Sequence, residues 1–267
     1  MERALELKRD RLGSRALEGK SVALVFERPS TRTRLSFDVG VHELGGHPLI
    51  MRPDELQVSR GESLRDLALV LSRMVHVVGI RTGPHAAVEE LAEHASIPVV
   101  NMLTREHHPC QALADLVTLR ERFGALEGLK LAYVGDGNNV ARSLRILGAI
   151  AGVEVEVASP PELSLDGLPH VEAADAVRDA HAVYADVWVS MGDEDDAEQK
   201  RALLAPYRLD EALLAGARDD AVALHCLPAH PGEEISAGVL YGERSAIWDQ
   251  AENRLHAQKA LLELLVS

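Results

Sequence analysis

The sequence predicts an α/β protein built from two doubly wound domains, each a parallel sheet flanked by helices. Short runs rich in Val, Ile, Leu and Ala alternate along the chain with segments that carry apolar residues at helical spacing. Polar clusters follow these runs, as loops at the carboxyl edge of a parallel sheet do. A chain of 267 residues also fits two domains of ordinary size better than one.

The first alternating series of strands and helices lies between residues 20 and 102. The first nineteen residues mix charges with Leu and Ala, which predicts one short helix. We expect strands at 20–26, 47–51, 75–80 and 98–102, with helices at 35–44, 62–74 and 84–94.

The second series follows a helix that we expect at 109–123. Its strands are predicted at 129–134, 153–158, 182–189, 221–225 and 245–248. The chain closes with an amphipathic helix at 249–266, in which Ala251, Leu255, Ala260 and Leu264 give one apolar face.

Composition restricts the partners and the compartment. A formal charge of -14 argues against a surface for nucleic acid or for an anionic membrane. The two cysteines, Cys110 and Cys226, are too few for a disulfide framework. The sequence also contains neither a run of eighteen apolar residues nor a signal-peptide core. We therefore expect a protein of the reducing cytoplasm.

The turn between the first strand and the first long helix is a candidate phosphate site. It reads Ser30-Thr31-Arg32-Thr33-Arg34, so Ser30 can cap the helix and the first-turn N–H groups can meet an anion. Two hydroxyls and the guanidinium fork of Arg32 add donors suited to phosphate oxygens. The alternative is a capped helix that begins with a solvated basic turn.

Polar clusters also follow the other predicted strands. Because the carboxyl ends of parallel strands meet at one edge, we expect these clusters to gather there. They are Arg81-Thr82, His107-His108-Pro109-Cys110-Gln111, Gly135-Asp136-Gly137-Asn138-Asn139, the segment 186–192, the segment 225–230, and the segment 249–254 that opens the last helix.

Six motifs, in this order, resemble those of the aspartate/ornithine carbamoyltransferase family. They are STRTR at 30–34, HPCQ at 108–111, GDGNN at 135–139, DVWVSMG at 186–192, HCLP at 225–228 and AENR at 251–254. The first two mark the whole family, and DVWVSMG with HCLP resembles its ornithine branch. Compared with that pattern, a leading helix is mostly absent before STRTR and the stretch 159–181 is shortened.

The resemblance implies transfer of the carbamoyl group of carbamoyl phosphate to the δ-amino group of L-ornithine. The products would be L-citrulline and phosphate, in arginine biosynthesis or in the reverse direction. It implies a domain at 1–116 that binds carbamoyl phosphate and is completed by the returning C-terminal helix, 250–267, and an ornithine-binding domain at 117–249. It further implies a homotrimer with sites shared between subunits, no cofactor and no metal.

The same resemblance assigns the site residues. Arg81, His108, Cys226 and Asp186 would be catalytic, and Gln57 would come from a loop of the neighbouring subunit. The carbamoyl phosphate site would comprise Ser30, Thr31, Arg32, Thr33, Gln57, Arg81, His108, Gln111, Cys226, Leu227 and Arg254. The ornithine site would comprise Asn139, Asp186, Ser190 and Met191.

The implied roles agree with the chemistry of the reaction. Attack on the carbonyl carbon builds an oxyanion, which Thr33, Arg81 and His108 would stabilise, while Gln111 would contact the carbamoyl amide. The δ-amine must lose a proton before it attacks, and departing phosphate can take that proton. Asp186 and Cys226 would orient the amine without forming an acyl-enzyme.

Three other interpretations remain open at this level. Gly135-Asp136-Gly137 after a strand imitates a dinucleotide-binding loop, although Val140 occupies the third glycine position. His225, Cys226 and His230 could ligate zinc in a binding protein, but no clear fourth ligand accompanies them. The chain could also be a homologue that binds the ligands without catalysis. Singly, His108 could be a structural histidine and Cys226 a small buried residue.

Overall fold

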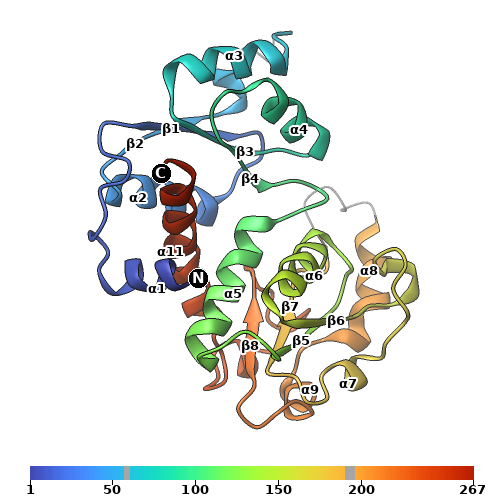
Figure 1. The fold of residues 1–267 in the computed structure, drawn as a ribbon. Coiled ribbons are helices and arrows are strands. Elements are labelled where there is room, and N and C mark those ends of the chain that lie inside the picture. The colour runs from blue at the N-terminus through green and yellow to red at the C-terminus, as the bar shows by residue number, and fades with distance from the viewer. Residues whose placement is uncertain (57–60, 190–195) are drawn as a thin grey trace. The chain divides into compact units, whose positions relative to one another are not determined.

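A computed structural model of the chain describes residues 1–56, 61–189 and 196–267. The chain divides into two compact units, which Figure 1 shows with their helices and strands labelled. Unit 1 comprises Met1–Val117 and Glu252–Ser267, and unit 2 comprises Thr118–Ala251. The predicted fold class is confirmed, because each unit contains a four-stranded parallel sheet flanked by helices.

Unit 1 is built on a sheet with the strand order β2-β1-β3-β4. The strands are β1 Ser21–Phe26, β2 His47–Met51, β3 Val77–Arg81 and β4 Val99–Leu103. The helices of this part of the chain are α1 Glu2–Arg9, α2 Thr31–Glu43, η1 Pro53–Glu55, α3 Leu64–Met74, α4 His85–His94, α5 Pro109–Phe123 and, from residue 252 on, α11 Ile247–Leu265.

Both faces of the first sheet are covered. Alternate residues of β1 point to opposite faces, so Leu24 packs in one apolar cluster with Phe37 of α2, and Val25 packs in another with Leu71 of α3. Leu262 of α11 belongs to the first of these clusters. The C-terminal helix therefore returns to the first unit, as predicted.

A buried ion pair fastens this helix. The Lys259 side chain is 0% exposed, and its ammonium group donates to Glu43 at 2.7 Å and also to the backbone oxygen of Arg11. Arg11 pairs with the same carboxylate. Since removing one partner from a buried pair costs about 3–5 kcal/mol, these contacts hold α2, α11 and the segment after α1 together.

Unit 2 repeats the arrangement with the strand order β6-β5-β7-β8. The strands are β5 Lys130–Val134, β6 Glu154–Ala158, β7 Ala182–Ala185 and β8 Val222–His225. The described helices are α6 Asn139–Ala151, η3 Pro161–Leu163, α7 Ala173–Ala176, α8 Ala197–Leu204, η5 Ala205–Tyr207, α9 Glu211–Ala215 and α10 Ala237–Leu240.

The strand order determines where ligands can bind. In each sheet the first strand lies between the second and the third. The chain therefore moves to one side of the first strand to form the second strand, and to the other side to form the third. Crevices form at such switch points, outside the carboxyl ends of the strands. In unit 1 the loops after β1 and β3 meet there, and in unit 2 the loops after β5 and β7 do so. These loops carry most of the sequence-predicted site residues.

Two predicted strands are wrong in extent or type. β7 ends at Ala185 instead of residue 189, because the Asp186 side chain itself accepts the N–H of Val187 at 2.8 Å and ends the ladder. At 245–248 only Ser245 forms an isolated bridge, with Ala223, and Ile247 begins α11. A short apolar run at a helix start cannot be told from a buried strand by pattern alone.

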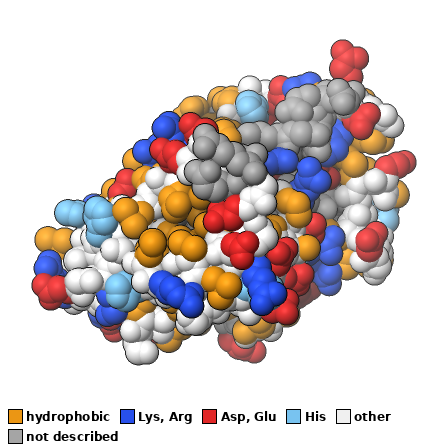
Figure 2. Space-filling model, turned by 90° about the horizontal axis from the view of Figure 1, so that it is seen from above, with side chains coloured by type: hydrophobic (Ala, Val, Ile, Leu, Met, Phe, Trp, Pro, Cys, Tyr) orange, Lys and Arg blue, Asp and Glu red, His pale blue; other side chains and the backbone are white. Residues whose placement is uncertain are grey.

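The surface agrees with the charge analysis. On the face drawn in Figure 2, Lys and Arg side chains are interspersed with Asp and Glu side chains. Within the described part of the chain, no helix combines the length and the apolar character that a membrane span requires.

Candidate active site

In unit 1 the site begins at the turn between β1 and α2. Ser30 has an extended backbone and its hydroxyl accepts the N–H of Thr33 at 3.3 Å, which is the predicted N-cap. Thr31 is exposed at the first turn of α2, Arg32 is half-buried and Thr33 is fully buried. The turn therefore presents a helix N-terminus, where an anion is stabilised by backbone N–H groups and by the helix dipole.

Arg254 joins this turn to the HPCQ helix. Its guanidinium, on α11, donates to the Thr33 hydroxyl and to the side-chain oxygen of Gln111, both at 2.7 Å. The residue is only 3% exposed. Three motifs that are far apart in the sequence therefore meet in one hydrogen-bonded cluster.

His108 lies in the field of three arginines. It is 5% exposed, and burial together with the positive charges of Arg254, Arg81 and Arg32 lowers its pKa well below the ordinary 6.5. Arg81 ends β3 and is itself buried. A neutral imidazole can still donate one N–H, so this part of the site offers donors without adding a fourth positive charge.

Gln111 has a partner that the sequence did not reveal. Its amide nitrogen donates to a carboxylate oxygen of Asp115 at 2.8 Å, and both side chains are buried in unit 1. Asp115 lies four residues later on α5, on the same face of the helix. The sequence shows an acidic residue one helical turn after HPCQ, but the pattern alone does not identify the side chain to which it bonds.

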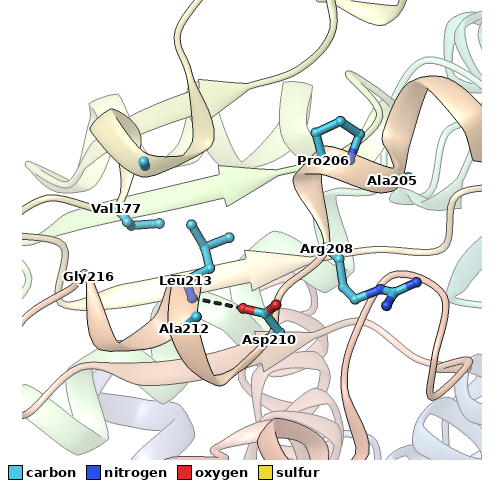
Figure 3. A pocket seen from close by; sticks show the side chains of 9 residues that line it. Val177, Ala205, Pro206, Arg208, Asp210, Ala212, Leu213 and Gly216 are labelled. Atoms are coloured by element: carbon cyan, nitrogen blue, oxygen red, sulfur yellow. Dashed lines mark hydrogen bonds between the residues drawn. The ribbon is translucent and has the colours of Figure 1, made fainter.

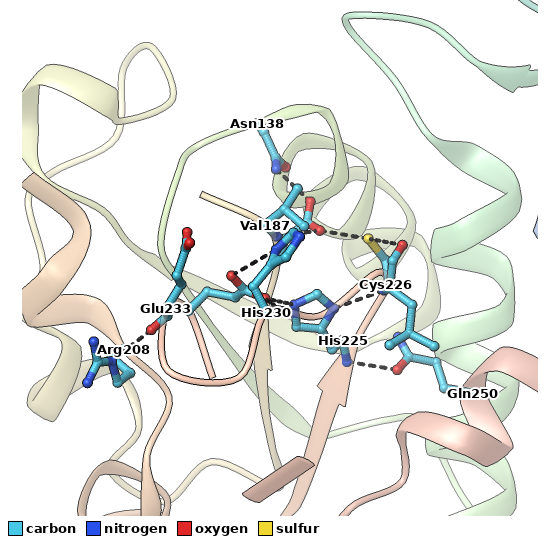
Figure 4. Close-up of polar contacts among 11 residues, drawn as sticks. Asn138, Val187, Arg208, His225, Cys226, His230, Glu233 and Gln250 are labelled. Carbon is cyan, nitrogen blue, oxygen red and sulfur yellow. Dashed lines mark hydrogen bonds and ion pairs between the residues drawn. The ribbon is translucent and has the colours of Figure 1, made fainter. Parts of the chain in front are cut away.

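In unit 2, Asp186 is the centre of the second cluster, whose other members Asn138, Val187 and Cys226 are labelled in Figure 4. One carboxylate oxygen accepts the amide of Asn138 at 2.7 Å, and the other accepts the Val187 N–H at 2.8 Å and the Cys226 thiol at 2.7 Å. The carboxylate is buried at the carboxyl end of β7. Its orientation is thus fixed by three neighbours, one of which is the Cys226 thiol.

Asn138, in the GDGNN motif, makes contacts that the sequence did not reveal. Its side-chain oxygen accepts the N–H groups of Val140 and Ala141, so it caps α6, while its amide nitrogen holds Asp186. The predicted Asn139 is the next residue, half-buried at the start of α6. The signal for Asn138 was an Asn at a predicted helix start.

The HCLP segment is held by a buried histidine (Figure 4). The Leu227 N–H donates to Nδ1 of His225 at 2.9 Å, and Nε2 of His225 lies 3.2 Å from Glu234. Because Nδ1 accepts, the proton is on Nε2 and is donated to the carboxylate. Burial raises the pKa of Glu234, but hydrogen bonds from His225 and the His230 N–H outweigh it and lower that pKa.

The described part of unit 2 contains one group with the composition of a metal site. Ligand atoms of Asp186, His225 and Cys226 lie within 4.8 Å of one another. Both ring nitrogens of His225 already take part in hydrogen bonds, to Leu227 and Glu234, and a metal there would break one of them. His230 does not belong to the group, so the zinc set of the alternative interpretation, His225, Cys226 and His230, is not assembled.

Three predicted residues, Gln57, Ser190 and Met191, lie outside the described residues. A surface pocket of about 380 Å³ in unit 2 (Figure 3) contains none of the predicted site residues. It is bordered by residues of α7, η5 and α9. Asp210 at its edge already caps α9 by accepting the Leu213 N–H at 2.8 Å. We assign no ligand to this pocket.

Comparisons with known proteins cover nearly the whole chain. Residues 1–121 match the family model "Aspartate/ornithine carbamoyltransferase, carbamoyl-P binding domain", and residues 127–265 match "Aspartate/ornithine carbamoyltransferase, Asp/Orn binding domain". The first stretch contains the cluster of unit 1 except for Arg254, and the second contains Arg254 and the cluster around Asp186.

Individual relatives agree with the family models. The ornithine carbamoyltransferase of Acidothermus cellulolyticus is 51% identical over 100% of this chain and 91% of its own, and that of Methanoculleus marisnigri is 51% identical over 94% and 85%. The solved ornithine carbamoyltransferase from Pyrococcus furiosus superposes with a TM-score of 0.94 at 44% identity, covering 99% of this chain and 91% of that one.

We expect His108 to stay neutral from about pH 6 to about pH 9. Histidine ring NMR should show no titration of His108 in that range, and Arg254→Met should move its pKa upward because one of the opposing charges is gone. In the unfolded chain His108 has an ordinary pKa, so below about pH 6.5 the unfolded state binds a proton that the folded state does not. The contribution of His108 to the free energy of unfolding is therefore present above about pH 6.5 and is lost as the pH falls below it. A wild-type titration midpoint near pH 6.5 would contradict this picture of the cluster.

Proposed function

The chain belongs to the aspartate/ornithine carbamoyltransferase family, and from that premise we propose that it transfers the carbamoyl group of carbamoyl phosphate to the δ-amino group of L-ornithine. The products are L-citrulline and phosphate, in the direction of arginine biosynthesis or in its reverse. The observation that carries the proposal is the Arg254 guanidinium, which joins Thr33 and Gln111 in one buried cluster beside a capped helix N-terminus.

Unit 1 is the proposed carbamoyl phosphate domain. The phosphate would meet the α2 N-terminus, the side chains of Ser30 and Thr31, and the guanidinium of Arg32. Three arginines act on His108 here, so the local field is positive although the whole chain carries a charge of -14. A dianionic ligand is therefore attracted to this cluster and repelled by much of the remaining surface.

The same cluster suits the transition state of the transfer. Attack of an amine on the carbonyl carbon places negative charge on its oxygen, and the Thr33 hydroxyl, Arg81 and the neutral His108 are donors that can stabilise it. We assign the carbamoyl amide to Gln111 and to the backbone of Cys226 and Leu227. The Leu227 N–H already donates to His225, and the Leu227 carbonyl oxygen lies 3.8 Å from the Cys226 thiol.

Unit 2 is the proposed ornithine domain. Asp186 would bind the δ-amine, and Asn139 would bind the amino-acid end together with Ser190 and Met191, for which the structure gives no description. The fixed Asp186 carboxylate suits this role because it cannot rotate away from the amine. Cys226 contributes as a neighbour of that carboxylate and not as a nucleophile.

The reaction then proceeds by direct transfer. The δ-amine loses its proton, its lone pair forms the new C–N bond, and the bond between the carbonyl carbon and the bridging phosphate oxygen breaks. Phosphate leaves with the electron pair of that bond and can accept the proton. Arg81, His108, Asp186 and Cys226 are the proposed catalytic residues. We place the enzyme in a reducing cytoplasm, where Cys110 and Cys226 remain thiols as they are here.

An acceptor panel tests this proposal. With carbamoyl phosphate, the purified protein should form citrulline from L-ornithine, with a kcat/KM about 100-fold or more above that for putrescine, which lacks the α-carboxylate. Asp186→Asn should lower kcat/KM for ornithine by about 100-fold, because the amine loses its charged partner. Asp210→Asn, in the same unit, should leave it unchanged because Asp210 only caps α9.

The absence of citrulline would reduce the chain to a ligand-binding homologue, and equal specificity for ornithine and putrescine would refute the assigned acceptor. A melting shift on adding NAD, without citrulline formation, would favour the dinucleotide interpretation of the GDG loop instead.

We further propose a homotrimer in which the segment with Gln57 enters the carbamoyl phosphate site of the neighbouring subunit. The supporting feature is an apolar strip on α2, where Leu35 is 58% exposed and Val39, one turn later, is 36% exposed. Such a strip on a charged protein is suited to burial against a second copy of the chain.

Mixed assemblies test the shared site. Gln57→Ala and Arg254→Ala should each be nearly inactive alone, because each removes one ligand-binding group from every site. After co-refolding, some sites would combine an intact segment with an intact pocket, so activity should exceed the average of the unmixed controls. No gain, in a preparation shown by sedimentation to contain mixed trimers, would place Gln57 in its own subunit's site or in none.

A further inference from the structure

We propose that Asp115 is a positioning residue that fixes the carboxamide of Gln111 and thereby makes the site select a donor whose acyl group carries an amine. The inference rests on the proposed carbamoyl transfer and adds to it the residue that sets donor selectivity. Asp115 is not one of the sequence-predicted site residues, and it acts through Gln111 without touching the substrate.

Three side chains form a continuous chain of hydrogen bonds in unit 1. A carboxylate oxygen of Asp115 accepts from the Gln111 amide nitrogen at 2.8 Å, and the Gln111 oxygen accepts from Arg254 at 2.7 Å. The exposed fraction is 0% for Asp115, 1% for Gln111 and 3% for Arg254. Water therefore has little access to compete with either bond, and each has a strong influence on how the amide lies.

The chemistry of the two neighbours decides which end of the amide points where. A guanidinium can only donate hydrogen bonds, and a carboxylate oxygen of Asp115 accepts from the Gln111 amide nitrogen. Gln111 carries one accepting end and one donating end, so its NH₂ group must face Asp115 and its oxygen must face Arg254. The opposite orientation would set donor against donor and acceptor against acceptor.

This orientation presents an acceptor to the proposed ligand. A carbonyl oxygen has two lone pairs, and the bond from Arg254 uses one of them. The second can accept from the NH₂ group of a carbamoyl donor. A methyl group in that position, as in an acetyl phosphate, cannot donate and would leave the buried oxygen without this bond. The site should accordingly prefer carbamoyl over acetyl compounds.

Asp115 could also act through its negative charge, and a ligand pair separates the two effects. A change in charge near Arg254 alters the affinity for every phosphate-like dianion by a similar factor. A change in the orientation of Gln111 alters only the recognition of the NH₂ group. The ratio of affinities for an amide ligand and its methyl counterpart is therefore the measurement that a general structural or electrostatic role would not move.

The experiment uses phosphonoacetamide and acetonylphosphonate, which are stable and differ only by NH₂ in place of CH₃. Calorimetric titration of the wild-type protein should show phosphonoacetamide binding about tenfold or more tighter. Asp115→Ala removes the acceptor, leaves the Gln111 amide held only through its oxygen, and should reduce this ratio to within about threefold of unity.

Asp115→Asn is the conservative control. Its side-chain oxygen can still accept from Gln111 while its charge is gone, so the ratio should remain within about twofold of the wild-type value. In a Gln111→Ala background, Asp115→Ala should change the ratio no further, because the proposed effect on donor selectivity passes through the amide. If Asp115→Ala does not give a cooperative melt, Asp115→Leu keeps the branched shape with methyl groups in place of both oxygens.

A wild-type ratio retained in a folded Asp115→Ala or Asp115→Leu variant would overturn the proposal. So would an Asp115→Asn ratio as low as that of Asp115→Ala, since the charge and not the acceptor would then be responsible. Failure of the proposed function would look different, because the wild-type protein would then form no citrulline from carbamoyl phosphate and ornithine.

Discussion

The arrangement of unit 1 depends on keeping one guanidinium group out of water. A buried charge is costly unless it is paired by hydrogen bonds, and the two terminal nitrogens of Arg254 donate to Gln111 and Thr33. These partners are 221 and 143 residues away along the chain. The C-terminal helix must therefore return to the first sheet, where Leu262 and the Lys259–Glu43 pair secure it. The hydrogen bonds of Arg254 thus place a positive charge in the site and also tie the C-terminal helix to unit 1.

Unit 2 contains a buried anion, the Asp186 carboxylate, which also needs hydrogen-bond partners. Asp186 follows a strand that stops because its carboxylate takes the next backbone N–H, and Asn138 and Cys226 supply the other donors. A carboxylate held on three sides has little freedom to rotate. In the proposed reaction, this fixed carboxylate is the acceptor for the amine.

Much of the fold followed from local pattern. The buried β-branched runs gave the strands of both sheets, and the Ser30 cap followed from a hydroxyl residue placed before helical spacing. The motifs also contain Thr33, Gln111 and Arg254, which share hydrogen bonds in unit 1. The strand expected at 245–248 failed because Ser245 alone pairs with Ala223 and the following apolar residues begin a helix. Asp115 and Glu234 were missed, and the contacts of Asn138 were not foreseen, because these residues hold other residues in place. Such a role depends on tertiary contacts that spacing does not reveal.

The central claim is that the Arg254 cluster is an anion site, and binding of the product anion tests it directly. Calorimetry should show that inorganic phosphate binds the wild-type protein and binds Arg254→Met at least about 30-fold more weakly, because a charged donor is lost. Arg15→Met, which removes an exposed ion pair with Glu18, is the matched control and should bind normally. Wild-type phosphate affinity in an Arg254→Met protein with a native melting transition would contradict the account.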